Sequence, residues 1–164
     1  NAARQCGRSS AGATGVGARR RSGGTATCHP RCTGCADDAY QPNASAAQAP
    51  AIALLSSYAH LQLCPCRTDW FTFVLYKGQH VTIRAQYHKT ADFDLDLGLF
   101  PGAAVLPTLT GAAPGVRATA GGTGDSATRT IDFTADNGGA YSLQGGATTG
   151  ASARGSYSLT TVSK

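Results

Sequence analysis

Short alternations of apolar and polar residues recur along the chain from residue 70 onwards and predict β-strands. Residues 70–75 combine aromatic and β-branched types, with one face aromatic and aliphatic, and residues 80–87 alternate strictly, so that their apolar side chains share one face. The other expected strands are 52–55, 95–99, 128–134, 140–144 and 156–162. Glycine-rich breaks separate several of them. Seven to nine short strands of this kind predict an all-β fold, a two-sheet antiparallel β-sandwich with a jelly-roll or immunoglobulin-like path.

The composition agrees with a β protein and argues against several kinds of catalysis. Glycine supplies 21 of the 164 residues, and only 14% of the residues are charged. Glutamate is absent, so the chain has no H-E-x-x-H metalloprotease motif, and it also has no G-x-S-x-G nucleophile elbow. None of the four histidines lies in a recognisable catalytic frame, and His80 and His88 are expected at the exposed ends of a strand. We therefore expect no enzymatic activity.

The net charge of +5 belongs to the first part of the chain. Residues 1–36 contain six arginines and no acidic residue, whereas residues 37–164 contain eight Lys or Arg and nine Asp, a net charge of 8 − 9 = −1. Residues 1–27 contain almost nothing to bury, and residues 28–37 form a cysteine cluster. This predicts a disordered, cysteine-containing tail at 1–36 before a folded domain at 37–164. Arg19–Arg21 can contact nucleic acid or another anionic surface, but no aromatic residues accompany them, so a solvated segment is favoured.

Six cysteines in a chain of this size favour disulfide bonds and an oxidising compartment. They are Cys6, Cys28, Cys32 and Cys35 in the tail, and Cys64 and Cys66 just before the tryptophan. Zinc binding by some of these thiolates is the alternative, but the spacing lacks the paired C-x2-C pattern of a zinc knuckle. No apolar run reaches the length of a membrane span.

Five short motifs resemble the bacterial pre-peptidase C-terminal domain, a family related to the collagen-binding domain of bacterial collagenases. Asp38-Ala39-Tyr40-Gln41-Pro42-Asn43 is similar to the family's D-x-Y-E-P-N-D, Asp69-Trp70-Phe71-Thr72-Phe73 to its D-W-F-x-F, and Asp92-Phe93-Asp94-Leu95-Asp96-Leu97 to its D-x-D-L-x-L. Gly139-Ala140-Tyr141-Ser142-Leu143 and Gly155-Ser156-Tyr157-Ser158-Leu159 look like its two G-x-Y-x-L strands. The resemblance covers roughly residues 37–162.

The resemblance implies a calcium site and a disulfide. Asp38, Asn43 and Asp69 match the positions that hold calcium in relatives, where the linker meets the sandwich. Gln41 and Ala44 replace two carboxylates of the family pattern, which weakens the expected site; the alternative is that Asp38 and Asn43 only shape a turn. The family pattern also implies a Cys35–Cys64 disulfide, with Cys66 either paired within the tail or free.

A second acidic run, Asp92-Phe93-Asp94-Leu95-Asp96, is another candidate for a metal-binding loop. A strand period of two puts its three carboxylates on one face, where solvated or cross-strand paired acids are the commoner arrangement.

The expected function follows from the family. These domains are non-catalytic parts of secreted bacterial proteins, often attached to an exported peptidase, and are expected to support folding, anchoring or substrate targeting. The expected partner is a parent peptidase or another exported module, and the expected location is extracellular or in the cell envelope. Two alternatives remain: an adhesion module that binds collagen or another extracellular protein or polysaccharide, and binding of an anionic surface or nucleic acid through the basic tail.

Overall fold

The computed structural model describes residues 35–36, 38–102, 115–149 and 153–164. In this part of the chain nearly all regular structure is β. The elements are a 3-10 helix η1 (Ala46–Gln48) and the strands β1 (Ser57–Leu63), β2 (Asp69–Leu75), β3 (His80–His88), β4 (Leu95–Pro101), β5 (Val116–Arg117), β6 (Thr119–Thr123), β7 (Ser126–Thr134), β8 (Gly139–Ala147) and β9 (Gly155–Ser163).

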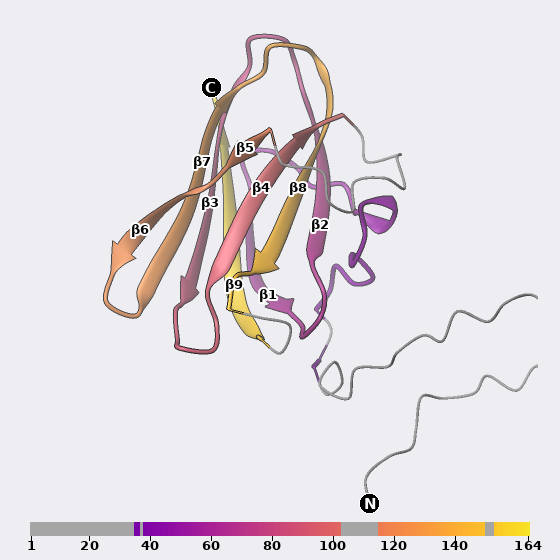
Figure 1. The fold of residues 1–164 in the computed structure, drawn as a ribbon. Helices are drawn as coiled ribbons and strands as arrows, with labels where there is room; N and C mark the ends of the chain where they lie inside the picture. The colour runs from indigo at the N-terminus through magenta and orange to yellow at the C-terminus, as the bar shows by residue number, and fades with distance from the viewer. Residues whose placement is uncertain (1–34, 37, 103–114, 150–152) are drawn as a thin grey trace, which may run out of the picture. The chain divides into compact units, whose positions relative to one another are not determined.

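The nine strands form two antiparallel sheets, as the alternating pattern predicted. One sheet has the order β1-β9-β3-β7-β6 and the other the order β2-β8-β4-β5, and the two are layered against each other in Figure 1. The chain changes sheet at Ala118, between β5 and β6: β5 pairs with β4 and β6 pairs with β7. The expected fold class, a two-sheet antiparallel β-sandwich, is confirmed.

Alternate side chains of both sheets form the core between them. On β3, Val81, Ile83 and Ala85 are fully buried. The contributions of β2 and β4 are Phe71, Phe73, Leu75, Leu95, Leu97 and Leu99. Trp70 lies on the opposite face of β2 from this core and packs against Phe100, with ring centroids 5.4 Å apart. The only tryptophan therefore belongs to a core strand without being part of the central cluster.

The sequence pattern misplaced one strand and missed three. Residues 52–55 do not form a strand: Ala51 makes an isolated parallel bridge to Thr72, and Leu55 has a positive φ of 61° that interrupts extended structure. The strand β1 was not predicted, because a bulge between Tyr58 and Leu61 breaks the alternation of its apolar residues. The short strands β5 and β6 were missed because they expose nearly all their side chains.

Most of the predicted tail, residues 1–36, lies outside the described residues, as do Cys6, Cys28, Cys32 and Arg19–Arg21. Cys66 is disulfide-bonded, so the alternative that it stays free is wrong. Within the described part of the chain, no helix has the length and apolar character needed to cross a membrane.

Candidate functional site

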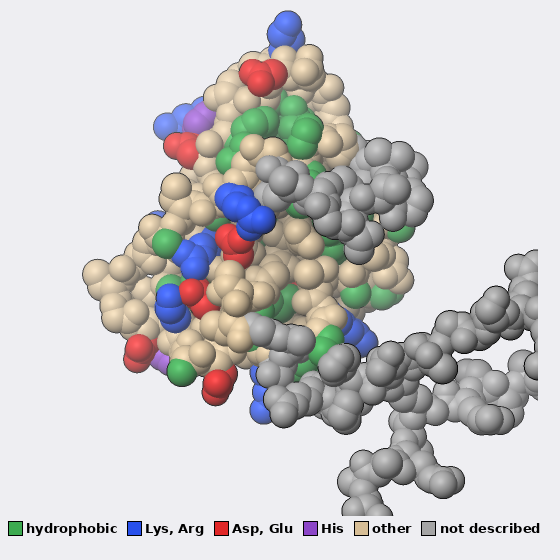
Figure 2. Space-filling view, in the orientation of Figure 1, with side chains coloured by type: hydrophobic (Ala, Val, Ile, Leu, Met, Phe, Trp, Pro, Cys, Tyr) green, Lys and Arg blue, Asp and Glu red, His purple; other side chains and the backbone are tan. Residues whose placement is uncertain are grey.

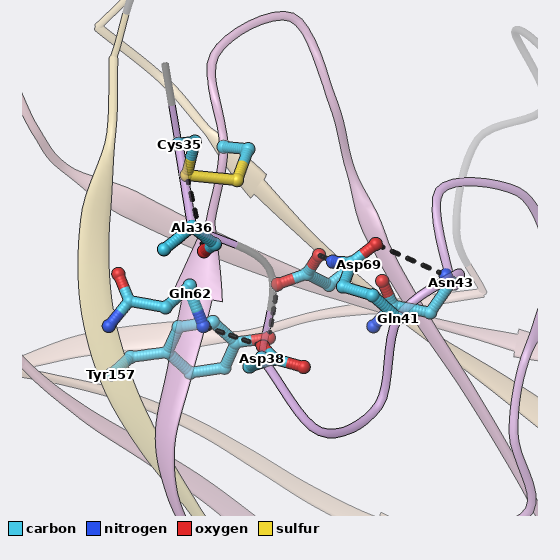
Figure 3. Close-up of a disulfide and its surroundings, with 9 residues drawn as sticks. Cys35, Ala36, Asp38, Gln41, Asn43, Gln62, Asp69 and Tyr157 are labelled. Carbon is cyan, nitrogen blue, oxygen red and sulfur yellow. Dashed lines mark hydrogen bonds between the residues drawn. A yellow bond between two sulfur atoms is a disulfide. The ribbon is translucent and has the colours of Figure 1, made fainter. Parts of the chain in front are cut away.

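A disulfide fastens the segment that enters the sandwich to the end of β1. Cys35 and Cys64 are joined with a Cα–Cα distance of 5.5 Å and a sequence separation of 29 residues (Figure 3). This is the pairing that the family resemblance implies. Because Cys64 follows directly after Leu63, the bond fixes residue 35 beside the sheet, and the following residues must turn back across it.

Asp38 continues this attachment through hydrogen bonds to two backbone amides. One carboxylate oxygen accepts from the Tyr40 N–H at 2.8 Å, and the other accepts from the Gln62 N–H at 2.7 Å. The first bond makes a local turn, as the sequence alternative proposed. The second satisfies one backbone donor on the outer edge of β1, so the segment 35–43, which we call the linker, covers this point of the sheet edge.

Asp69, the first residue of β2, is fully buried beneath this turn. Its carboxylate accepts hydrogen bonds from the Tyr157 hydroxyl at 2.8 Å and from the Gln41 side-chain amide at 3.4 Å. Burial raises the pKa of Asp69 to about 7, and the negative charge of Asp38 adds to the rise, while both hydrogen bonds oppose it. Burial also raises the pKa of the Tyr157 hydroxyl, as does the neighbouring Asp69.

Asn43 is fully buried, and its side-chain oxygen and nitrogen make no hydrogen bond within the described part of the chain. Its backbone is well held: the carbonyl accepts from the Trp70 N–H at 2.8 Å, and the N–H donates to the side-chain oxygen of Gln41 at 3.4 Å. An unpaired buried amide costs about 1–3 kcal/mol. A bound ligand would satisfy this buried side chain, and a cation would be bound by its Oδ1 atom.

These residues form one group, which we call the linker clasp: Cys35, Asp38, Gln41 and Asn43 from the linker, with Gln62, Cys64, Asp69 and Tyr157 from the sandwich (Figure 3). The three predicted calcium residues all belong to it. Calcium takes six to eight oxygen ligands, and the clasp offers two carboxylates and the side-chain oxygens of two amides. No three His, Cys or acidic side chains gather at a metal-binding distance among the described residues, so amide oxygens must contribute. The types of oxygen donor fit calcium, and the buried, unpaired side-chain amide of Asn43 supports that fit.

A second charged cluster lies between the two sheets around Asp94, just before β4. Its carboxylate accepts from Arg129 of β7 at 2.8 Å, from Lys89 at 2.7 Å and from the Tyr87 hydroxyl. Arg129 also donates to the Leu95 carbonyl. Burial opposes ionisation of Asp94, but the Lys89 and Tyr87 hydrogen bonds and the Arg129 charge together lower its pKa. Burial raises the pKa of Tyr87 to about 12, and its hydrogen bond to Asp94 adds to the rise.

The structure separates the three acids of the Asp92–Asp96 run. Asp92 is exposed, Asp94 turns inward to the cluster just described, and Asp96 pairs with Arg117 across β4 and β5 at 2.6 Å. Two of the three are therefore paired, as the sequence suggested, but they do not share one strand face. No metal site is assigned to this run.

Several partners of the clasp were not identified from the sequence. Tyr157 was expected only as an apolar strand residue, and Gln62 was not singled out. The signal that could have drawn attention to Tyr157 is its position in the G-x-Y-x-L motif. Of the strand-end histidines, His80 pairs with Asp132 at 2.7 Å and His88 is exposed, which agrees with their expected surface position.

The comparisons with known proteins report similarity of fold. No protein-family model and no curated protein matches the chain. Among solved structures the chain is similar to PliG of Aeromonas hydrophila, a periplasmic inhibitor of g-type lysozyme, at 17% identity over 71% of this chain and 96% of that one, with a TM-score of 0.50. It also matches the pre-peptidase C-terminal domain of a Bacillus anthracis collagenase, at 15% identity over 69% of this chain and 93% of that one, with a TM-score of 0.43. The second protein belongs to the family whose motifs the sequence resembles. At these identities the likeness concerns the fold alone.

Proposed function

We propose that residues 35–164 form a non-catalytic accessory domain of an exported protein, which supports folding, anchors the protein or directs it to a substrate. The observation that carries this proposal is the linker clasp, because it fastens the incoming chain to the sandwich by a covalent bond and by the Asp38 hydrogen bonds. A domain that must hold a neighbouring module in a fixed position needs such a junction. The disulfide also favours an oxidising compartment, outside the cytoplasm.

One fold neighbour supports the exported location that we propose, since its name describes a periplasmic protein, an inhibitor of lysozyme. The other is named as a domain of a collagenase. A parent peptidase is the partner that we propose for this chain, from the family that the motifs resemble, with another exported module as the alternative.

The natural open reading frame provides the first test. We expect it to encode an export signal and a second module. In the whole protein, removal of residues 35–164 should leave turnover of a small soluble substrate unchanged while lowering either the secreted yield or turnover of an insoluble substrate. A reading frame with no export signal, or hydrolytic activity of purified residues 35–164 on peptide, ester or glycoside substrates, would contradict the proposal.

We further propose that the linker clasp binds calcium through Asp38, Asn43 and Asp69, with Gln41 contributing its side-chain oxygen. The buried, unpaired Asn43 amide is the observation that favours it. A cation would supply positive charge beside the two carboxylates and so favour the ionised form of Asp69. The clasp would then hold the linker more firmly when calcium is present.

Thermal unfolding with calcium and with a chelator tests this second proposal. A ligand that binds only the folded state must raise the midpoint temperature of unfolding. At a calcium concentration a hundred times the Kd, the free energy of unfolding rises by about 2.7 kcal/mol. Asn43→Ala should abolish the shift, and Asp132→Asn, an exposed acid of β7, should keep it. An equal midpoint of the parent protein in calcium and in chelator would contradict calcium binding by the linker clasp.

A further inference from the structure

A polar groove crosses the outer face of the four-stranded sheet, on the side away from the core. It has a volume of about 270 Å³ and is lined by residues of β4, β5 and β8 and by Thr148. Pockets that hold whole small molecules begin at roughly 300 Å³. The groove therefore matches one ring of a longer chain better than a complete, enclosed ligand.

The strand register explains why a groove forms here. Gly98 of β4 pairs with Gln144 on one side and Arg117 on the other, and Gly146 of β8 pairs with Asp96. Each long polar side chain thus stands opposite a glycine. The two glycines leave the backbone bare as a floor, and the polar side chains form the walls.

Two of the wall residues are held in place by each other. Asp96 accepts from the Arg117 guanidinium at 2.6 Å through one oxygen and from the Leu97 N–H at 3.0 Å through the other. This pairing orients the carboxylate and leaves further guanidinium N–H groups of Arg117 to donate. Arg117 is 65% exposed, so these donors are accessible to a ligand.

The third wall residue, Gln144, is half-buried and its side-chain amide makes no hydrogen bond within the described part of the chain. An amide presents a donor and an acceptor side by side. Together with the Arg117 donors and the Asp96 acceptor, it can bind adjacent hydroxyl groups, each of which both donates and accepts. This donor and acceptor set suits a sugar ring.

The charges of the surrounding surface favour a neutral ligand. Asp96 and Arg117 neutralise each other, and on the face seen in Figure 2 the Lys and Arg side chains lie beside Asp side chains without a large area of one sign. A polyanion would need an excess of positive charge, which this face does not offer.

We propose that the groove bounded by Asp96, Arg117 and Gln144 binds a pyranose ring of a neutral polysaccharide. The proposal rests on the accessory role proposed above and gives it a ligand class, since a domain that directs an exported protein to an insoluble substrate must recognise that substrate. Binding is expected to be weak for a single ring, with a Kd in the millimolar range.

NMR titration of the ¹⁵N-labelled protein with cellohexaose, chitohexaose and maltohexaose tests the proposal. We expect at least one oligosaccharide to shift the amide signals of Gly98 and Gly146, which form the floor. Arg117→Ala and Gln144→Ala should each weaken binding by about tenfold or more. Arg84→Ala, which removes an exposed arginine from the five-stranded sheet, serves as the matched control and should bind as the parent does.

A variant that fills the floor separates binding from folding. A Cβ added at Gly146 would have Thr68 Cγ2 as its nearest neighbour at 3.7 Å, an ordinary contact, so Gly146→Ala should fold normally and bind less tightly. The proposal is overturned if none of the three oligosaccharides shifts Gly98 or Gly146 at millimolar concentration, or if the Arg84 variant loses binding as the Arg117 variant does. That result would leave the accessory role intact, because the role is tested separately by the reading frame and the deletion.

Discussion

The hydroxyl of Tyr157 donates to the buried carboxylate of Asp69 at 2.8 Å, and this bond joins β9 of the five-stranded sheet to β2 of the four-stranded sheet. Both residues are almost inaccessible to water. The bond therefore satisfies an acid that solvent cannot reach, at the point where the linker passes over the sandwich.

Tyr157→Phe should destabilise the protein. The substitution keeps the ring and removes the donor, so the carboxylate of Asp69 loses a partner, at a cost of about 1–3 kcal/mol. Urea unfolding at pH 7 measures the loss. Tyr76→Phe, at a tyrosine that is 77% exposed, is the control and should change the free energy of unfolding by less than about 0.5 kcal/mol. Equal effects of the two substitutions would show that the Tyr157 bond contributes nothing.

Stability should fall as pH rises from 4 to 7, because of Asp69. Its pKa is about 7 in the folded state and 3.8 in a solvated chain, so between these values the folded protein holds a proton that the unfolded chain has released. The contribution of protonated Asp69 to the free energy of unfolding is fully present below pH 3.8 and is lost as the pH rises through 7. At about 1.4 kcal/mol per pH unit, the change is on the order of 4 kcal/mol.

Asp69→Asn isolates this contribution. The amide mimics the protonated acid, so the variant should lack the fall in stability between pH 4 and 7, while other groups continue to titrate as in the parent. Asp94, whose pKa is lowered, contributes in the opposite sense and remains in both proteins. Parallel pH profiles of the parent and the variant, measured by urea unfolding, would rule out a raised pKa at Asp69.

Removing the Cys35–Cys64 disulfide should cost about 3–4 kcal/mol, the value expected for closing a loop of this length. The double variant Cys35→Ser with Cys64→Ser is compared with the parent by thermal unfolding. Protease cleavage between residues 35 and 64 should also accelerate in the variant, because only hydrogen bonds, such as those of Asp38, Gln41 and Asn43, then hold this segment to the sandwich. A midpoint equal to that of the parent would mean that the hydrogen bonds of the clasp suffice.

Arg129→Met should destabilise the sandwich by about 1–3 kcal/mol, because Asp94 then keeps only Lys89 and Tyr87 as partners and the Leu95 carbonyl loses a donor. Arg117→Met removes a comparable ion pair that is largely exposed, and it should cost no more than about 1 kcal/mol. The two variants are compared by chemical denaturation at the same salt concentration. A larger effect at Arg117 than at Arg129 would contradict the inward position of Asp94.

The sequence predicted the sandwich because its central strands bury one face each, and a half-buried strand shows in the alternation of its residues. The strict alternation of Val81, Ile83 and Ala85 is an example, and all three are buried. Strand β6 could not be found this way, since its residues are all exposed and its place is set by pairing with β7. The orientation of Trp70 was also beyond the pattern: an alternating strand has two faces, and the position of the second sheet decides which one is the core.

The clasp was predictable in part. The family motifs brought Asp38, Asn43 and Asp69 forward, and the structure places them in one group. The buried state of Asn43 and the bond between Tyr157 and Asp69 depend on contacts between residues far apart in the chain, which a single sequence does not contain.

The position of the disulfide also determines how the domain would carry a mechanical load. Cys64 follows the end of β1, beside the start of β9, while the C-terminal residues leave from the other end of β9. Tension between a module attached before residue 35 and an anchor at residue 164 would pull β1 and β9 along their lengths in opposite directions. Their hydrogen bonds run across the strands, so they would share the force together and would not open one after another. A domain attached in this way would resist extension until all the hydrogen bonds between β1 and β9 broke at once.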